Sequence, residues 1–81
     1  MIKIRSNVKM LIAKEEAKEM RTIPASEIAR DARLSENTVR NLALGRTRRI
    51  DVHVLEKVLW YFHERGRDYG LDDLFDVEIV K

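Results

Sequence analysis

Several residue types are scarce in this chain of 81 residues, and each scarcity excludes a class of protein. It contains no cysteine, which excludes a disulfide framework and a thiolate zinc site. It has no apolar run long enough to cross a membrane and no signal-peptide pattern at its start, so we expect a cytoplasmic protein with no membrane partner. Its length predicts one domain over residues 1–81.

Charge is abundant but unevenly distributed along the chain. The net charge is only +2, although 37% of the residues are charged. Residues 1–20 carry five positive and three negative groups, residues 21–50 carry seven and three, and residues 51–81 carry four and eight. Positive charge is therefore concentrated in the middle third, where it favours a polyanionic partner, and the acidic last third is expected to face away from it.

Residues 24–45 are expected to form two short helices, and the single proline, Pro24, marks the start of the first. Pro24 restricts its own backbone and that of the preceding residue, so a helix is expected from about residue 24 to residue 32. Ile28, Ala29 and Ala32 share one face of this helix, and the small Ala29 allows a second helix to cross closely. Residues 33–35 are too few to do more than turn the chain sharply.

The second helix is delimited at both ends. Ser35 is a good N-cap residue before residues 36–44, and Gly45 stands where a left-handed residue commonly ends a helix. Val39 and Leu42 have the spacing of an inward face, which leaves a polar outward face. Its side chains can hydrogen-bond to base edges in the major groove of DNA, and the predicted base readers are Glu36, Asn37, Thr38, Arg40 and Asn41.

In this order the motifs resemble the lambda-repressor-like helix-turn-helix family, of the Cro/CI or Xre type. The resemblance covers about residues 5–75 and is carried by residues 23–29, by Leu34-Ser35, by residues 38–45 and by a basic loop that leads into Ile50-Asp51. It implies a mainly α fold, a five-helix domain with the helix-turn-helix at residues 24–45. It also implies a sequence-specific double-stranded DNA-binding regulator of bacterial or phage type, repressor-like and dimeric.

The chain departs from the family pattern at two positions. The family commonly has glycine in the turn, whereas this chain has Arg33, which must then carry a left-handed backbone at a cost of about 1 kcal/mol. A polar residue often precedes the terminal glycine and reaches a phosphate, whereas this chain has Leu44. The second departure removes one expected backbone contact.

Phosphate contacts are predicted on both sides of the second helix. The front of the first helix offers free N–H groups to an anion, and the basic run after Gly45 offers guanidinium groups. The predicted phosphate-binding residues are Ala25, Ser26, Arg46, Thr47, Arg48 and Arg49.

The chain ends alternate in the manner of strands, with Ile2 and Ile4 on one face near the start and Val77 and Ile79 near the end. We expect these short strands to pair, within one chain or across a dimer, because unpaired edges are usually avoided. Between them we expect a helix over residues 8–19 with Ser6 or Asn7 as its cap, a helix from Asp51 to about residue 65, and a helical turn at residues 71–75.

The helix after the basic loop has more apolar residues than one face can hold. Leu55, Val58, Leu59 and Phe62 form a sufficient core stripe, yet Trp60 and Tyr61 are apolar as well. These two aromatic residues either pack beneath the terminal strands or the first helix, or contribute to a subunit contact. The predicted dimer contacts are Ile2, Ile4, Trp60, Tyr61, Val77 and Ile79.

No residue pattern favours an enzyme, a metal site or a cofactor. His53 and His63 lie ten positions apart, which is not the spacing of a metal pair, and no glycine-rich phosphate loop is present. Asp72 and Asp73 point to different helix faces, and the three serines have the positions of helix caps or first turns. With no separate ligand domain, a small-molecule ligand is not expected.

A second hypothesis is a protein-interaction module, such as an antitoxin-like or adaptor protein with the same fold. The acidic segment at residues 68–78 and the surplus apolar surface near Trp60 would carry that role. RNA is less favoured as a partner, since an A-form major groove does not admit a helix.

Overall fold

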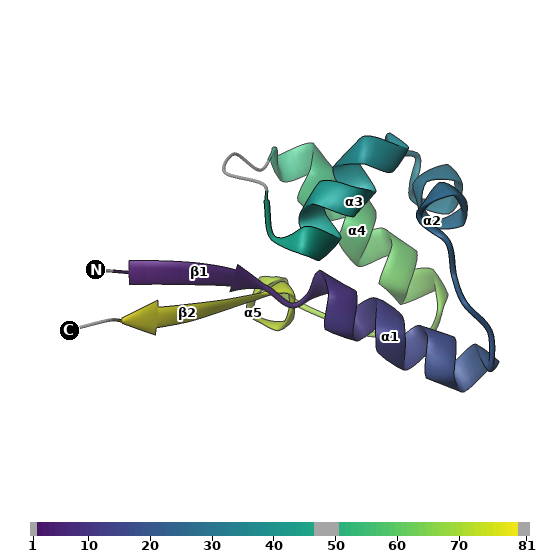
Figure 1. The fold of residues 1–81 in the computed structure, drawn as a ribbon, viewed down its shortest axis with the longest axis horizontal. Helices are drawn as coiled ribbons and strands as arrows, with labels where there is room; N and C mark the ends of the chain where they lie inside the picture. Colours follow the sequence, from purple (N-terminus) through teal and green to yellow (C-terminus); the bar gives the residue numbers. More distant parts are fainter. Residues whose placement is uncertain (1, 47–50, 80–81) are drawn as a thin grey trace.

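The structure is a computed structural model that describes residues 2–46 and 51–79. Within these residues the chain is mainly helical, with one short two-stranded antiparallel sheet. The elements in chain order are β1 (Ile2–Ser6), α1 (Val8–Glu19), α2 (Ala25–Ala32), α3 (Glu36–Leu44), α4 (Val52–Glu64), α5 (Leu71–Leu74) and β2 (Phe75–Ile79) (Figure 1). The predicted mainly α class, the paired terminal strands and the approximate position of each element are confirmed.

The helices enclose one hydrophobic core. Phe62 and Leu74 are almost completely buried at its centre. The other buried apolar residues are Val8, Leu11, Ile12, Ile23, Ile28, Ala29, Ala32, Val39, Leu42, Val58 and Tyr61. Every helix contributes to this set, so α2 and α3 are fixed to the body by their inner faces.

The inner faces of α2 and α3 are buried. Ala29 and Ala32 are buried on the predicted inner face of α2, and α2 packs against both α3 and α4. Val39 and Leu42 of α3 are also buried, whereas Leu34 in the connector is half-buried against the core. The inward face of α3 is therefore the predicted one, and its other side is turned to solvent.

The core stripe of α4 is rotated relative to the prediction. Asp51 caps α4 as expected, since its Oδ1 accepts a hydrogen bond of 2.7 Å from the backbone N–H of His53. Val58, Tyr61 and Phe62 are buried, whereas Leu55 and Leu59 lie half-buried at the edges of the stripe. Packing against the body therefore selected a stripe that contains Tyr61 in place of Leu55 and Leu59.

The terminal strands pair within the chain and form a ribbon that projects from the helical body (Figure 1). Ile2 lies opposite Ile79 and Ile4 opposite Val77. The ribbon accounts for much of the elongated shape of the molecule, which measures 40 × 23 × 20 Å. Hydrogen bonds anchor its base to the body. Ser6 Oγ donates to the carbonyl oxygen of Leu42 at 2.7 Å, and the backbone N–H of Asn7 donates to the carbonyl oxygen of Leu74 at 2.8 Å.

None of the helices in the described parts of the chain is long and apolar enough to cross a membrane.

Candidate nucleic-acid interface

The candidate interface begins at the N-terminus of α2. Pro24 is its N-cap residue in extended conformation, and its carbonyl oxygen accepts from the N–H groups of Glu27 and Ile28 at 3.0 and 3.2 Å. The first N–H groups of a helix have no partner within the helix, so those of Ala25 and Ser26 are directed out of its front end. Ser26 is exposed and Ala25 half-buried, which leaves both predicted phosphate contacts at an accessible helix end.

The turn between α2 and α3 has the conformation that the sequence required of it. Arg33 is left-handed, with φ 58° and ψ 44°, at the position where the resembled family has glycine. The N–H of Leu34 donates to the carbonyl oxygen of Ala29 at 2.8 Å. The Nζ of Lys57 donates to the carbonyl oxygen of Arg33 at 3.1 Å. The turn is therefore bound both to α2 and to α4, which fixes the angle at which α3 leaves it.

The start of α3 is held by a hydroxyl cap. Ser35 Oγ accepts a hydrogen bond of 3.1 Å from the backbone N–H of Thr38, and the two hydroxyl oxygens lie 2.6 Å apart. This confirms the predicted cap. It also gives the Thr38 hydroxyl a partner within the chain, so its predicted part in base readout has to compete with the cap.

The five predicted base readers share the outer side of α3 but are not equally accessible. Asn37 and Arg40 are exposed, whereas Glu36, Thr38 and Asn41 are half-buried. Arg40 forms an ion pair with Glu36 one turn earlier on the same helix. Asn37 is therefore an exposed amide on this face, and Arg40 would have to exchange its carboxylate partner for a ligand.

The C-terminal end of α3 has the predicted left-handed glycine. Gly45 has φ 70°, and the N–H of Arg46 donates to the carbonyl oxygen of Asn41 at 3.0 Å. Arg46 is exposed directly after this turn. The other three predicted phosphate contacts of the basic loop, Thr47, Arg48 and Arg49, lie outside the described residues.

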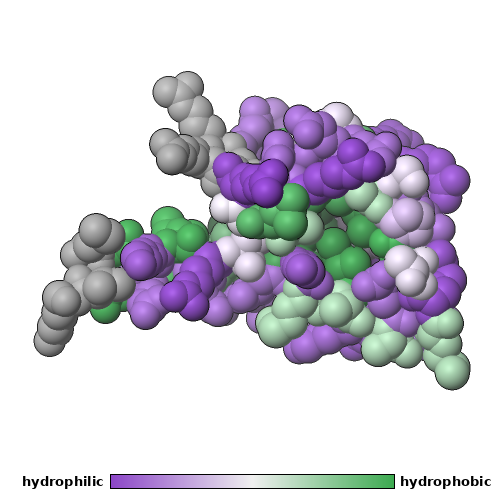
Figure 2. Space-filling model, in the orientation of Figure 1, coloured by the Kyte–Doolittle hydropathy of each residue, from purple (hydrophilic) through white to green (hydrophobic). Residues whose placement is uncertain are grey.

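A hollow of about 310 Å³ separates α3 from α1 on one side. Its walls are mostly apolar, and the residues that α3 contributes to it are Val39, Arg40, Ala43 and Leu44. Figure 2 shows this hollow as a recess lined with hydrophobic residues between α1 and α3. Arg40 and Leu44 are exposed at the edge of this hollow.

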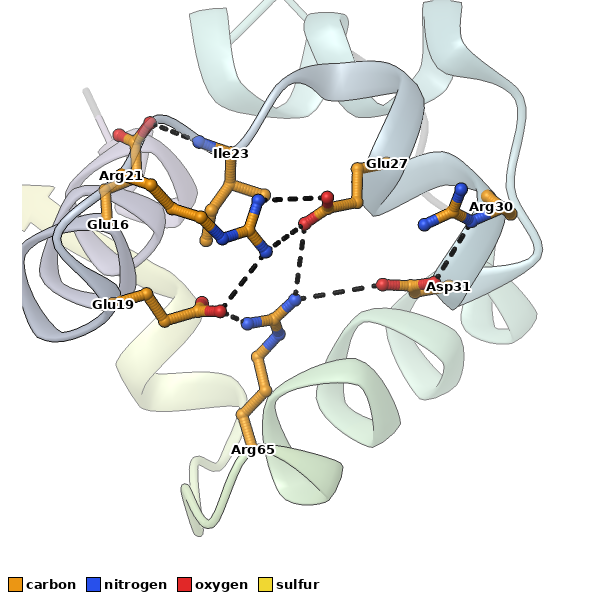
Figure 3. Close-up of polar contacts among 8 residues, drawn as sticks. All are labelled: Glu16, Glu19, Arg21, Ile23, Glu27, Arg30, Asp31 and Arg65. Atoms are coloured by element: carbon orange, nitrogen blue, oxygen red, sulfur yellow. Dashed lines mark hydrogen bonds and ion pairs between the residues drawn. The ribbon is translucent and has the colours of Figure 1, made fainter.

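Sequence reasoning missed an ion-pair cluster that fixes α2 to its neighbours (Figure 3). Arg21, which follows α1, donates to both carboxylate oxygens of Glu27 in α2, at 3.0 and 2.7 Å. Arg65 at the end of α4 pairs with Glu19 and lies 3.8 Å from carboxylate oxygens of Glu27 and Asp31. The hydrogen bonds from Arg21 lower the pKa of the Glu27 carboxyl below its ordinary value. The cluster connects α1, α2 and α4, so it orients the helix pair.

A second missed feature is a buried carboxylate. Glu15 is only 1% exposed, and its Oε1 accepts a hydrogen bond of 2.5 Å from Nε of Arg67. Residues 14–21 are mostly charged or small, which by composition alone favours a solvated helix end. A signal was nevertheless present, because Val8, Leu11 and Glu15 lie on one stripe with a spacing of i, i+3 and i+7.

The predicted dimer contact at Tyr61 is wrong. Tyr61 is 4% exposed within the single chain, because it faces the core from α4, and burial raises its pKa to about 12. The guanidinium of Arg65 lies 4.6 Å from the centre of its ring. Trp60, in contrast, is 58% exposed, and the remaining predicted contacts, Ile2, Ile4, Val77 and Ile79, are exposed as well.

The residues considered for catalysis stay apart. His53 lies exposed at the start of α4, and the His63 ring lies 5.2 Å from that of Trp60 in the last turn of the same helix. Across residues 2–46 and 51–79, no group of three or more histidine, aspartate or glutamate side chains is arranged to hold a metal ion.

Comparison of the chain with models of protein families, with curated proteins and with solved structures found no match.

Proposed function

We propose that this chain is a sequence-specific double-stranded DNA-binding regulator of the lambda-repressor-like helix-turn-helix type, repressor-like and acting in the cytoplasm. The observation that carries the proposal is the outer face of α3. Asn37 and Arg40 are exposed there, on a helix whose opposite face is locked into the core by Val39 and Leu42. A rigid helix with an exposed polar face has the form that a major groove accepts.

In the proposed complex α3 enters the major groove. Its nine residues span about 13 Å, which suits contact with a few successive base pairs. Asn37 and Asn41 are suited to adenine and Arg40 to guanine. Arg40 leaves Glu36 when it binds, so the ion pair in the free protein opposes DNA binding and holds the guanidinium on the correct face beforehand.

Phosphates are bound on both sides of this helix. The N–H groups at the front of α2, at Ala25 and Ser26, suit one phosphate, since a helix N-terminus attracts anions. Arg46 extends from the end of α3, and Thr47, Arg48 and Arg49 keep their predicted phosphate roles. These contacts position the protein without reading sequence.

The proposed regulator acts as a homodimer. Two-fold dimers of this kind bind half-sites one helical turn apart, about 34 Å, so the operator is expected to be a palindrome. The acidic last third of the chain would lie away from the duplex.

The first test is selection of bound sites from a randomised duplex pool, followed by binding of the recovered site. Replacing Arg40 or Asn41 by alanine is expected to cost about 1 to 3 kcal/mol of binding free energy and to relax preference at one base pair. Arg48→Ala should weaken binding to all sequences and flatten the dependence of affinity on salt. Lys18→Ala removes the same charge from the exposed end of α1 and is the matched control.

The proposal is wrong if no sequence is enriched and random duplex binds without salt dependence. An unaltered salt slope in Arg48→Ala, with specific binding retained, would remove only the phosphate role of that residue.

A second candidate function is the protein-interaction module, favoured by one observation. Trp60 is exposed beside an open hollow of about 740 Å³ between the end of α2 and α4. The residues that line it are Arg30, Asp31, Ala32, Arg33, Glu56, Lys57, Trp60 and Glu64. In this case Trp60→Ala would abolish binding of the protein partner, and the affinity for DNA would be negligible at any salt concentration.

A further inference from the structure

Two alanines line the hollow between α1 and α3 (Figure 2). Ala13 belongs to α1 and Ala43 to α3, and each leaves space that a larger side chain would fill. Three residues of the hydrophobic core, Ile12, Ile28 and Val39, line the hollow as well. The hollow is therefore an apolar recess in the side of the helical body.

The volume of the hollow suits a small molecule. It measures about 310 Å³, at the lower end of the range of about 300 to 1,000 Å³ that is usual for ligand pockets. At about 30 Å³ for each water molecule, this space holds roughly ten water-sized atoms. A ligand of about ten heavy atoms would therefore fill it.

The rim of the hollow carries positive charge. Lys9 of α1 and Arg40 of α3 line it, and both are exposed. The carboxylate of Glu16 lines it too, but its Oε2 already accepts a hydrogen bond of 2.8 Å from the backbone N–H of Ile23. Arg40 is paired with Glu36, in an exposed ion pair of the kind that contributes little and exchanges readily. The two cations therefore attract an anion to the mouth of an apolar recess.

An exposed leucine extends the apolar surface of the hollow. Leu44 lines it and is 54% exposed. It stands directly before Gly45, where the resembled family often has a polar residue that reaches a phosphate. The proposed DNA contacts do not use Leu44. An aliphatic chain bound in the hollow would remove part of its surface from water, which favours binding.

We propose that the hollow binds a small amphiphilic anion, a free carboxylic acid with an unbranched chain of about eight carbons. The chain lies against Ala13, Ala43 and Leu44, and the carboxylate lies at the rim with Lys9 and Arg40. Ammonium and guanidinium groups bind carboxylates through charge-assisted hydrogen bonds. Burial of the chain supplies most of the affinity, and the cations select an anion over an uncharged chain of the same length.

Arg40 belongs both to this hollow and to the polar face of α3. In the proposed DNA complex it contacts guanine, so the following consequence rests on the proposed function. A carboxylate bound to the guanidinium of Arg40 occupies the group that the base requires. The amphiphile and the operator therefore compete, and the ligand releases the protein from DNA. Binding of the ligand itself does not require DNA.

The first measurement is a titration of the full chain with octanoate, without DNA, followed by amide chemical shifts in NMR spectra. Saturable shifts are expected near Ala13 and Ala43. Hexanoate is two methylene groups shorter and should bind about tenfold more weakly, since each buried methylene group changes affinity about fourfold. Octanol has the same chain without the charge, so it should bind more weakly than octanoate.

Two variants with matched controls locate the site. Ala13→Leu fills the hollow and should weaken octanoate binding about tenfold or more. Its control is Ala17→Leu, because Ala17 is exposed one turn later on α1 and does not line the hollow. Lys9→Gln should weaken the binding of octanoate but not of octanol, whereas Lys18→Gln, at the far end of α1, should change neither. The lysine variants keep the test decisive if Ala13→Leu fails to fold.

The proposal is overturned by shifts that do not saturate, or by Ala13→Leu and Ala17→Leu binding octanoate equally, because both results indicate adventitious surface binding only. Equal affinities for octanoate and octanol also overturn it, since the rim would then select no anion. With the operator recovered by selection, octanoate should raise the Kd for DNA in the wild type and not in Ala13→Leu. Lack of competition, with both ligands bound, refutes the regulatory consequence.

Failure of this site and failure of the proposed function give different results. A saturable octanoate site in a chain that selects no DNA sequence refutes the proposed function and supports the hollow as a ligand site. Specific DNA binding by a chain without an octanoate site does the reverse.

Discussion

The helical body and the terminal ribbon use the same aliphatic residue types with opposite outcomes. In the body, Leu74 and Phe62 are almost fully buried. In the ribbon, Ile4 and Ile79 are about two-thirds exposed, although they stand on a regular apolar face. An alternating pattern thus identifies a face, but burial depends on whether another layer covers that face.

The same contrast applies to charge. Glu15 is buried in the body and depends on Arg67, whereas Arg5 and Glu78 pair on the ribbon in open solvent. The body keeps α2 and α3 rigid for the proposed DNA contact. The outer aliphatic residues of the ribbon are exposed and take no part in the core of the body.

The largest expected effect comes from truncating one aliphatic residue in each region. Leu74→Ala leaves a cavity at a fully buried position and should lower the free energy of unfolding by about 2 to 5 kcal/mol. Ile79→Ala should change it by about 0.5 kcal/mol or less, as surface substitutions usually do. Urea unfolding at low protein concentration measures both. Equal losses would show that the ribbon is as well packed as the body.

A smaller effect is expected from the two ion pairs. Arg67→Met leaves the Glu15 carboxylate buried without its partner and should destabilise the chain, though less than Leu74→Ala because Arg67 is partly exposed. Adding Glu15→Met should recover part of the loss. On the ribbon, Arg5→Met should have almost no effect, since exposed pairs contribute little. Thermal unfolding of the wild type, Arg67→Met, Arg67→Met/Glu15→Met and Arg5→Met measures these changes. It shows whether the loss on removing Arg67 depends on the presence of Glu15.

The pH dependence of stability should be a property of the body. The Glu27 pKa is lower in the folded chain than its ordinary value of 4.5, so the unfolded chain takes up the proton first as the pH falls. The stabilisation is fully present above pH 4.5 and is lost as the pH falls below it. Arg21→Met should make the acid limb of stability against pH shallower, whereas Glu78→Gln on the ribbon should leave it unchanged. Urea midpoints across acid pH measure this.

The smallest effect is expected at Tyr61, whose hydroxyl is buried without a hydrogen-bond partner in the described chain. Tyr61→Phe removes a buried polar atom and keeps the ring, so the free energy of unfolding should stay the same or rise slightly. Absorbance titration of the wild-type chain should show one tyrosine with a pKa of about 12, absent from the variant. A clear destabilisation would mean that the hydroxyl has a partner.

Much of the helix pair could be predicted because its signals are local. Pro24, Ser35 and Gly45 act on neighbours within about four residues, and their caps and turns appear where the sequence placed them. The charged surroundings of the pair could not be predicted in this way. Arg65 and Glu19 are separated by 46 residues, and no pattern along the chain relates them.

The sequence by itself determined where the helices begin and end, and which residues form the polar side of α3, since caps, turns and helical spacing depend on the nearest residues. Only the tertiary structure decided which side of α4 is buried, so that Tyr61 enters the core and Trp60 remains outside. It also decided that Glu15 is buried and that the terminal strands pair within the chain, at Ile2 with Ile79. These outcomes depend on contacts between distant segments, whose geometry is fixed only when the whole core packs.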